Sequence, residues 1–169
     1  MSHLYASLFY QADMTEIFSD HALLKYMIQA EVALAKAQAQ IGVIPESAAT
    51  IIADVANTQG IQAIDFENLA IATGLAGNIA IPFVKQFTAA VKAVDEDASR
   101  YVHWGATSQD ILDTACILQA RDALDIVEFQ LRQAYVASLE LTEKYRAEVM
   151  IGRTWLQQAL PITFGHKAA

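Results

Sequence analysis

Cysteine, proline and glycine are scarce in this sequence. Its 169 residues include one cysteine, three prolines and seven glycines. A single cysteine excludes a framework of intramolecular disulfides and suits a reducing compartment, so we expect a cytoplasmic protein. Cys116 stands among apolar residues of a helical pattern, which predicts a buried and unreactive thiol. Because helix-breaking residues are few and strong helix formers are many, the composition favours an all-α fold.

Basic residues and long apolar runs are also scarce. There are 11 Lys and Arg residues against 19 Asp and Glu, which gives a net charge of −8, and no basic run occurs. Binding nucleic acid requires clustered positive charge, so we expect no nucleic-acid partner. The most apolar segment, residues 69–84, is interrupted by Thr73, two glycines, Asn78 and Pro82, which excludes a membrane span. The N-terminus lacks a basic region followed by an apolar stretch, so we expect no secretory signal.

The spacing of apolar residues predicts a series of helices before residue 107. Ser19 and Asp20 form a favourable helix start after an irregular segment, residues 1–14, and Gly42 suits the end of that helix. No apolar–polar alternation of useful length, typical of a β-strand, is present. Further helices are expected at residues 46–56, 65–71 and 82–94, with a turn at 57–60 and a flexible loop at 73–78. The acidic residues 95–97 predict either a solvated turn or the start of a short helix up to residue 101.

One much longer helix is expected over residues 108–150, because neither glycine nor proline occurs between Gly105 and Gly152. At 1.5 Å per residue it would be about 60 Å long, far longer than an ordinary helix. The preceding helices are too short to cover its apolar residues, so other long helices must pack on it, from the same chain or from other subunits. We therefore expect an N-terminal helical domain at residues 1–107 and the start of a long-helix bundle, incomplete here, at 108–169.

A polar segment leads into this long helix. Thr107 and Asp110 have the spacing of a capping box, and the free N–H groups at a helix N-terminus suit an anionic ligand. His103 stands four residues before Thr107 and titrates near neutral pH, so it could exchange a proton with a ligand bound there. Ordinary capping, with a histidine that only hydrogen-bonds its own loop, explains the same residues. Spacing alone leaves both interpretations open.

Two segments carry a family resemblance. Residues 103–114, His-Trp-Gly-Ala-Thr-Ser-Gln-Asp-Ile-Leu-Asp-Thr, resemble the first signature region of the fumarase/aspartase superfamily. Residues 152–161, Gly-Arg-Thr-Trp-Leu-Gln-Gln-Ala-Leu-Pro, resemble its second region, and residues 76–78 with 81–85 form a weaker third match. Within the superfamily, the first segment is most similar to the lactone-forming cycloisomerases.

The resemblance implies an architecture. Superfamily members have an all-α fold in which an N-terminal domain of short helices precedes the first long helix of a central bundle. They assemble as homotetramers, and each active site takes three regions from three subunits. The third region, a mobile loop with a serine and a Lys-Arg-Asn cluster, is not in this sequence. We therefore expect an N-terminal fragment that is inactive by itself.

The resemblance also implies an activity. The cycloisomerases are intramolecular lyases that act on a small anionic tricarboxylate, a carboxylated muconate from protocatechuate breakdown in the β-ketoadipate pathway, and form a carboxymuconolactone. They use no metal and no organic cofactor. Carried over by position, the site comprises Thr107 and Ser108 on a substrate carboxylate, His103 for proton transfer or charge stabilisation, Thr154 and Gln157 from the second region, and Asn78 lining the pocket.

Trp155 marks a departure from the superfamily's lyases, which have a histidine at this position. Tryptophan exchanges no proton at neutral pH, so the substitution matches the cycloisomerases and weakens a lyase interpretation. Two roles stay open for Trp155: an anchor packed on the bundle, or a wall of the substrate pocket. Two alternative functions also remain. One is an adenylosuccinate lyase-like or other superfamily lyase, disfavoured for nucleotides because the first arginine is Arg100; the other is a non-catalytic helical oligomerisation module.

Overall fold

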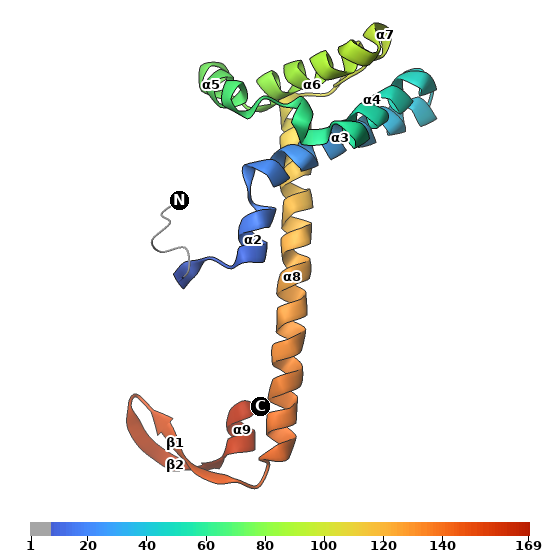
Figure 1. The fold of residues 1–169 in the computed structure, drawn as a ribbon. Helices are drawn as coiled ribbons and strands as arrows, with labels where there is room; N and C mark the ends of the chain where they lie inside the picture. Colours follow the sequence, from blue (N-terminus) through green and yellow to red (C-terminus); the bar gives the residue numbers. More distant parts are fainter. Residues whose placement is uncertain (1–7) are drawn as a thin grey trace. The chain divides into compact units, whose positions relative to one another are not determined.

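The computed structural model describes residues 8–169 and confirms the all-α class, with one small sheet added (Figure 1). The chain divides into two compact units, with the boundary between Asp122 and Ala123 inside the longest helix. The elements are α2 (Ala12–Ile17), α3 (Asp20–Gln40), α4 (Glu46–Thr58), the 3-10 helix η1 (Gly60–Ala63), α5 (Phe66–Ala76), α6 (Ala80–Val94), α7 (Glu96–Ser99), α8 (Ser108–Lys144), β1 (Val149–Thr154), β2 (Gln157–Thr163) and α9 (Phe164–Ala168).

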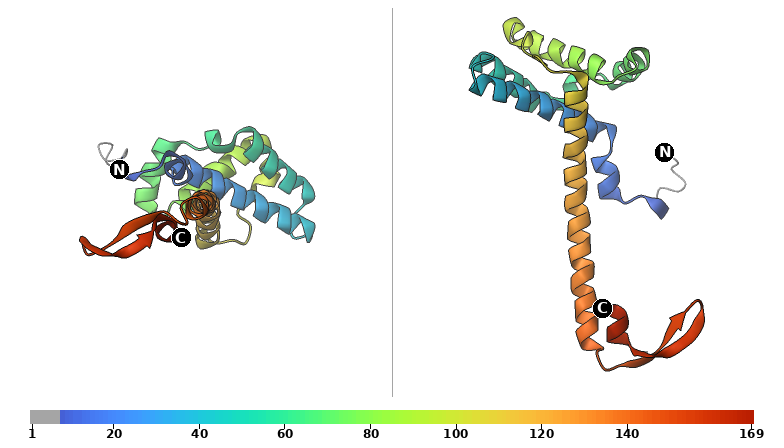
Figure 2. Two further views of the ribbon diagram at one scale, coloured as in Figure 1. Left: turned by 90° about the horizontal axis from the view of Figure 1, so that it is seen from below. Right: turned by 180° about the vertical axis from the view of Figure 1, so that it is seen from behind.

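The first unit has its core between two layers of helices. Helices α3 and α4 lie side by side, and α5, α6 and α7 form the layer next to them (Figures 1 and 2). The fully buried side chains include Met27 of α3, Ile52 of α4, and Phe83 and Phe87 of α6, whose rings stack at 6.1 Å between centroids. Ala115, from the beginning of α8, is also fully buried in this core. The start of α8 is therefore fixed by the packing of the first unit.

Nearby residues in the sequence cap the starts of α3 and α7 and the end of α3. The Ser19 hydroxyl accepts a 3.1 Å hydrogen bond from the Ala22 N–H at the start of α3. Asp95 does the same for α7, accepting from the Ala98 N–H at 2.7 Å. At the end of α3, Gly42 has a positive φ of 74°, a backbone conformation that glycine adopts without strain. The predicted helix start at Ser19 and helix end at Gly42 are confirmed.

Other predicted boundaries are wrong. Helix α2 occupies part of the segment predicted to be irregular, residues 1–14, of which 1–7 lie outside the described residues. A residue distant in sequence stabilises its last turn, because Gln119 of α8 donates a 2.8 Å hydrogen bond to the Ile17 carbonyl. Helix α4 runs to Thr58 through the predicted turn, and α5 runs to Ala76 through the predicted loop. A glycine inside a helix costs only about 1 kcal/mol, so α5 continues through Gly74 and ends at Gly77, whose φ is 66°.

The long helix differs from its prediction in two ways. It ends at Lys144 rather than residue 150, because the chain turns there into a β-hairpin. Cys116 is exposed, not buried as predicted. Its neighbour Ala115 takes the buried position, and consecutive residues of a helix point about 100° apart, so a mixed apolar segment did not reveal which of the two faces the core.

The second unit contains the β-hairpin, which corrects the prediction that no strand is present. β1 and β2 pair antiparallel, with a bulge between Ile151 and Arg153. Gly152 lies at this bulge, where a Cβ atom would stand 2.8 Å from the Leu160 carbonyl oxygen, so only glycine fits. Most side chains on both faces of the hairpin are exposed. Because neither face of the hairpin is buried, its strands need no alternation of apolar and polar residues, and the sequence therefore showed none.

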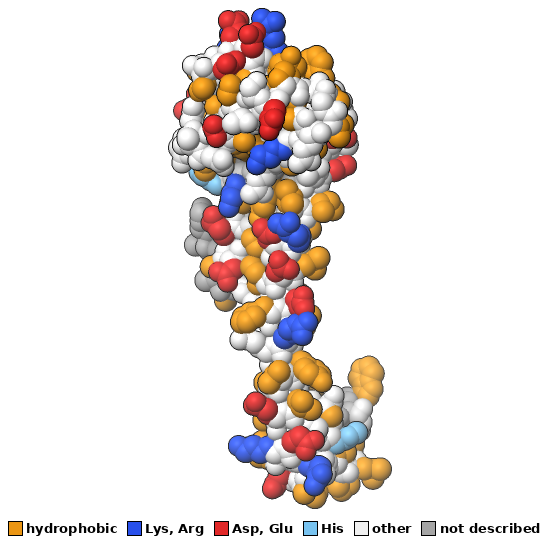
Figure 3. Space-filling view, turned by 90° about the vertical axis from the view of Figure 1, so that its right-hand side faces the viewer, with side chains coloured by type: hydrophobic (Ala, Val, Ile, Leu, Met, Phe, Trp, Pro, Cys, Tyr) orange, Lys and Arg blue, Asp and Glu red, His pale blue; other side chains and the backbone are white. Residues whose placement is uncertain are grey.

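The second half of α8 presents a stripe of apolar side chains to solvent. Leu124, Val127, Leu131 and Tyr135 are 64%, 38%, 64% and 69% exposed, and orange side chains mixed with charged ones mark this stretch in the space-filling view (Figure 3). No helix among residues 8–169 is long and apolar enough to cross a membrane. Bundle helices present stripes of this kind to one another, as the sequence predicted for a long helix that the preceding helices cannot cover.

Candidate active site

The loop between α7 and α8 carries His103, and a buried glutamate holds this histidine. His103 has a positive φ of 57°. Its backbone N–H donates to Oε2 of Glu31 on α3 at 3.1 Å, and its ring Nδ1 lies 2.7 Å from Glu31 Oε1. Glu31 is 1% exposed and the His103 side chain is 18% exposed. The Nδ1 edge of the imidazole is thus fixed against the core, and Glu31 makes no bond to Nε2.

A second side chain of α3 holds the same loop. Gln38 donates a 2.7 Å hydrogen bond from Nε2 to the Trp104 carbonyl. Glu31 and Gln38 are about two helical turns apart and so lie on one face of α3. The Trp104 ring also contacts Tyr101, with 5.5 Å between ring centroids. The conformation of the loop is therefore held by side chains of α3 together with contacts among its own residues.

Burial raises the pKa of the Glu31 carboxyl, and its hydrogen bonds and charge interaction with His103 oppose this shift. A carboxylate without water needs polar partners, because an unpaired buried charge is strongly unfavourable. The hydrogen-bond partners that the structure gives Glu31 are both atoms of His103. The two residues consequently form one electrostatic unit.

Half of the predicted capping box is present at the start of α8. The Thr107 N–H donates a 2.9 Å hydrogen bond to Asp110 Oδ2, as a capping box requires. Thr107 is the residue that precedes the helix, and Ser108 is its first helical residue. Thr107 is exposed and Ser108 half-buried. Since the first N–H groups of a helix have no acceptor within it, this end of α8 can bind an anion.

The structure brings His103, Thr107 and Ser108 together in one short segment and places Asn78 in another. Asn78 Oδ1 accepts a 2.8 Å hydrogen bond from the Ala80 N–H, which closes the first turn of α6. This local bond explains Asn78 without a ligand. Its predicted place in a substrate pocket stays a prediction.

The other three predicted site residues, Thr154, Trp155 and Gln157, belong to the hairpin of the second unit. Thr154 pairs with Gln157 in the strand register, and Trp155 and Leu156 form the two-residue turn between them. Both turn residues have positive φ, 46° and 63°. Trp155 is 93% exposed. Its two suggested roles, an anchor packed on the bundle and a wall of the substrate pocket, both stay predictions.

Glu31 and Gln38 were missed in the sequence. Glu31 stands within the apolar face of α3, where Leu24, Met27 and Ile28 are buried. A carboxylate on such a face was the available signal, because a charged side chain is almost never buried unless it is paired. The sequence showed no partner for it, since His103 lies 72 residues away.

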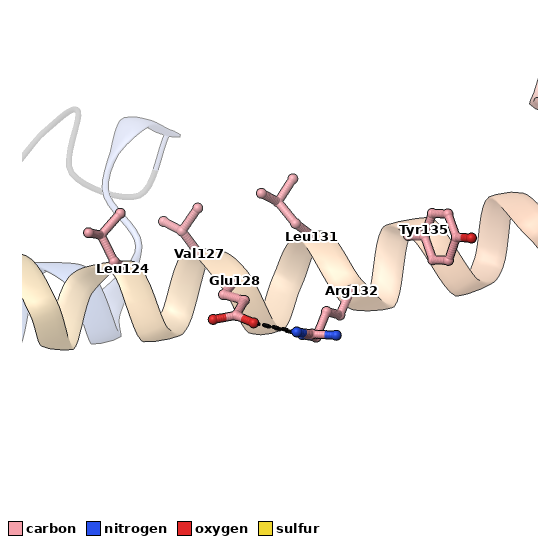
Figure 4. A pocket seen from close by; sticks show the side chains of 6 residues that line it. All are labelled: Leu124, Val127, Glu128, Leu131, Arg132 and Tyr135. Carbon is pink, nitrogen blue, oxygen red and sulfur yellow. Dashed lines mark hydrogen bonds and ion pairs between the residues drawn. The ribbon is translucent and has the colours of Figure 1, made fainter.

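No three His, Cys, Asp or Glu side chains gather in a possible metal site among residues 8–169. A further hollow lies on α8 in the second unit and is lined by Leu124, Val127, Glu128, Leu131, Arg132 and Tyr135 (Figure 4). All six come from a single helix, and Arg132 and Glu128 are paired with each other at 2.6 Å. This hollow is part of the exposed apolar stripe and lacks the converging polar groups of an active site.

A comparison with protein-family models matches the part of the chain that contains both the His103 loop and the hairpin. The family model described as "Lyase" matches residues 10–169. The chain belongs to this lyase family. The resemblance to the fumarase/aspartase superfamily is therefore confirmed, and the His103 loop and the hairpin both lie within the matched residues.

Individual relatives of this lyase-family chain have more specific names. The 3-carboxy-cis,cis-muconate cycloisomerase of Acinetobacter baylyi is 72% identical over all 169 residues, which span 37% of that protein. The nitrosuccinate lyase of Streptomyces davaonensis is 44% identical over 151 residues, or 89% of this chain and 31% of that protein. The crystal structure of β-carboxy-cis,cis-muconate cycloisomerase from Acinetobacter calcoaceticus is 71% identical, with a TM-score of 0.94 over 98% of this chain and 38% of that one.

Proposed function

We propose that this chain is part of a cycloisomerase that converts 3-carboxy-cis,cis-muconate into a carboxymuconolactone. The observation that carries the proposal is the 72% identity to a protein of that name, which extends over the whole chain. The chain spans little more than a third of that relative. The activity is therefore proposed for the complete protein, and the 169 residues supply part of the site.

The reaction requires an anion-binding site and a proton. One carboxylate oxygen of the substrate forms a C–O bond to a carbon of the diene, and the displaced electron pair moves onto the neighbouring carbon and its carboxylate. A proton then joins that carbon and completes the lactone. Hydrogen-bond donors aimed at the carboxylate oxygens lower the energy of the charged intermediate, because they are oriented before the charge develops.

The residues of the first unit suit these needs. Thr107 and Ser108, with the N–H groups of the first turn of α8, bind a substrate carboxylate, and the positive end of the helix dipole favours its charge. His103 exchanges a proton or stabilises charge through Nε2, the ring nitrogen that Glu31 leaves open. In the proposed homotetramer, Asn78 and, from the hairpin of another subunit, Thr154, Trp155 and Gln157 complete the proposed site. No cofactor is required for this chemistry.

The complete protein is proposed to be a cytoplasmic homotetramer. The exposed apolar stripe on α8 supports burial against other long helices, since a surface of this kind is unusual on a monomer. The single free Cys116 supports a reducing compartment. The substrate is a small tricarboxylate of aromatic catabolism, and neither nucleic acid nor membrane is a partner.

A chimera tests the proposed activity. This chain replaces the matching segment of the Acinetobacter baylyi cycloisomerase, and the loss of the conjugated diene's ultraviolet absorbance is followed after addition of 3-carboxy-cis,cis-muconate. We expect turnover close to that of the unaltered relative. The isolated 169-residue chain, measured in parallel, should show none. A folded chimera that leaves the diene intact would reject the proposal.

A lyase is the second candidate, and the 44% identity to nitrosuccinate lyase favours it. Such an enzyme would break a bond next to a carboxylate rather than form one. The same chimera is not informative here, because its remaining segment belongs to a cycloisomerase. A second chimera, in which this chain replaces the matching segment of the Streptomyces davaonensis protein, is assayed for consumption of nitrosuccinate and distinguishes the two. Trp155 in place of the lyase histidine predicts little or no consumption.

A further inference from the structure

Glu31 is the one charged side chain in the core among residues 8–169. It lies on a face of α3 whose other buried members are mostly apolar, and an apolar side chain of similar size would fill this position without losing hydration. Both hydrogen bonds that the structure gives its carboxyl oxygens are made with His103: one oxygen accepts from the backbone N–H, and the other is bonded to ring Nδ1. The buried Glu31 thus fixes the position of His103, although a buried carboxyl group is less favourable in the core than an apolar side chain.

We propose that Glu31 is a positioning residue that keeps the His103 ring proton on Nδ1 and leaves Nε2 free to exchange a proton with the substrate. The proposal rests on the proposed function for its catalytic consequence, but the position of the ring proton is independent of that function. The two oxygens of Glu31 are 3.1 Å from the His103 backbone nitrogen and 2.7 Å from Nδ1. A carboxylate can accept both bonds at once.

The backbone bond contributes as much as the ring bond. His103 has a φ of 57°, in the left-handed region that non-glycine residues seldom adopt. Such a conformation costs on the order of 1–3 kcal/mol and persists only where surrounding contacts impose it. The bond from the His103 N–H to Glu31 Oε2 is one of these contacts. Glu31 therefore fixes both the direction in which the side chain leaves the backbone and the rotation of the ring.

Replacing the carboxylate by an amide separates positioning from packing. In Glu31→Gln the side chain keeps its shape but has one acceptor oxygen and one NH2 donor. If the oxygen accepts from the His103 backbone, the NH2 group faces Nδ1, which must become an acceptor. The ring proton then moves to Nε2. Exchanging the carboxylate of a catalytic triad for its amide has this effect and lowers kcat about 10⁴-fold with the geometry intact.

The first experiment measures the ring proton directly. The chain is labelled with ¹⁵N-histidine, and the nitrogen shifts of neutral His103 are compared between wild type and Glu31→Gln. His103→Gln assigns the signals, and the exposed His21 and His166 serve as internal controls. We expect the proton on Nδ1 in wild type and on Nε2 in the variant. A wild-type proton on Nε2, as a protonated Glu31 that donates to Nδ1 would produce, overturns the proposal even if the variant does not fold.

The second experiment measures the consequence in the cycloisomerase chimera. Glu31→Gln should lower kcat by roughly 10²–10⁴-fold, the usual contribution of an acid–base group, with little change in KM. Glu46→Gln, the same change at an exposed position in the first turn of α4, should leave kcat unaltered. A Glu31→Gln chimera with shifted ring proton and unchanged kcat overturns the positioning role. If the wild-type chimera is inactive while the NMR result is as expected, the proposed function fails and the proton assignment stands.

Discussion

The Tyr26 hydroxyl donates a 2.5 Å hydrogen bond to Asp122 Oδ2, and this bond ties α3 to α8 across 96 residues of sequence. The bond to Tyr26 and then those from Arg121 hold the pKa of the Asp122 carboxyl below its usual range. The same hydrogen bond, with burial, raises the pKa of the Tyr26 hydroxyl. α3 also carries Glu31, so this contact helps to keep the helix that holds His103 against the helix that begins at Ser108.

Tyr26→Phe should lower the free energy of unfolding by about 1 kcal/mol, the typical contribution of one hydrogen bond. Urea denaturation of the chain measures this difference. Tyr135→Phe, at a position that is 69% exposed, is the matched control and should change stability little. A double-mutant cycle with Asp122→Ala, which removes the acceptor, tests the assignment, because additive effects of the two substitutions would show that the bond contributes nothing.

The pH dependence of stability provides a second prediction through Glu31. Its folded pKa is raised above the ordinary value of 4.5. Stabilisation from the neutral carboxyl is therefore fully present below pH 4.5 and is lost as the pH rises through the folded pKa. Glu31→Gln cannot ionise, so its stability relative to wild type should increase over this window. Urea denaturation at a series of pH values measures this, and parallel curves for the two proteins would contradict it.

Ser108→Ala tests the anion site at the start of α8. Thr107, not Ser108, precedes the helix and donates to Asp110, so the substitution should leave stability nearly unchanged. In the chimera it should raise KM for 3-carboxy-cis,cis-muconate on the order of tenfold, as expected for one lost hydrogen bond to a charged group. Ser47→Ala, an exposed serine in the first turn of α4, is the matched control. An unchanged KM would remove Ser108 from the site.

His103→Gln tests the proton-transfer role in the same chimera. Glutamine retains a polar side chain but cannot exchange a proton near neutral pH, so kcat should fall by roughly 10²–10⁴-fold. The His103 side chain is 18% exposed, and we expect a modest change in thermal stability. His21→Gln, at an exposed histidine of α3, should have normal kcat. Full activity of His103→Gln would reject both the role of His103 and the catalytic consequence proposed for Glu31.

Gly165→Ala tests how the end of α8 is packed in the second unit. A Cβ atom at Gly165 would stand 2.5 Å from the Thr142 carbonyl oxygen and 2.8 Å from Arg146 Cα. Because both neighbours are backbone, relief requires α9 to move, at a cost of about 1–3 kcal/mol. Hydrogen exchange of the amides around Tyr145 should therefore become faster. Gly74→Ala is the control, since nothing lies within 4 Å of its Cβ position inside α5, and it should be neutral or stabilising.

Much of the fold was predictable because its determinants are local. Ser19 and Asp95 each bind an N–H group three residues ahead, and Thr107 donates to a carboxylate three residues ahead. Such bonds depend on residue order and not on distant packing. The family was predictable for a different reason, since residues 103–114 resemble a superfamily motif and the comparison with known proteins confirms the family. The roles of His103, Thr107 and Ser108 stay predictions.

Contacts between distant residues could not be predicted in this way. The partners Glu31 and His103 are 72 residues apart, and Tyr26 and Asp122 are 96 apart. Each pair meets because the apolar faces of α3 and of the start of α8 are buried in one core, and burial of apolar area specifies no particular polar partner. The sequence established the helices, the motif and the exposed apolar surface. The packing of α3 determined which ring nitrogen of His103 is held, because a buried carboxylate lies only where the assembled helices place it.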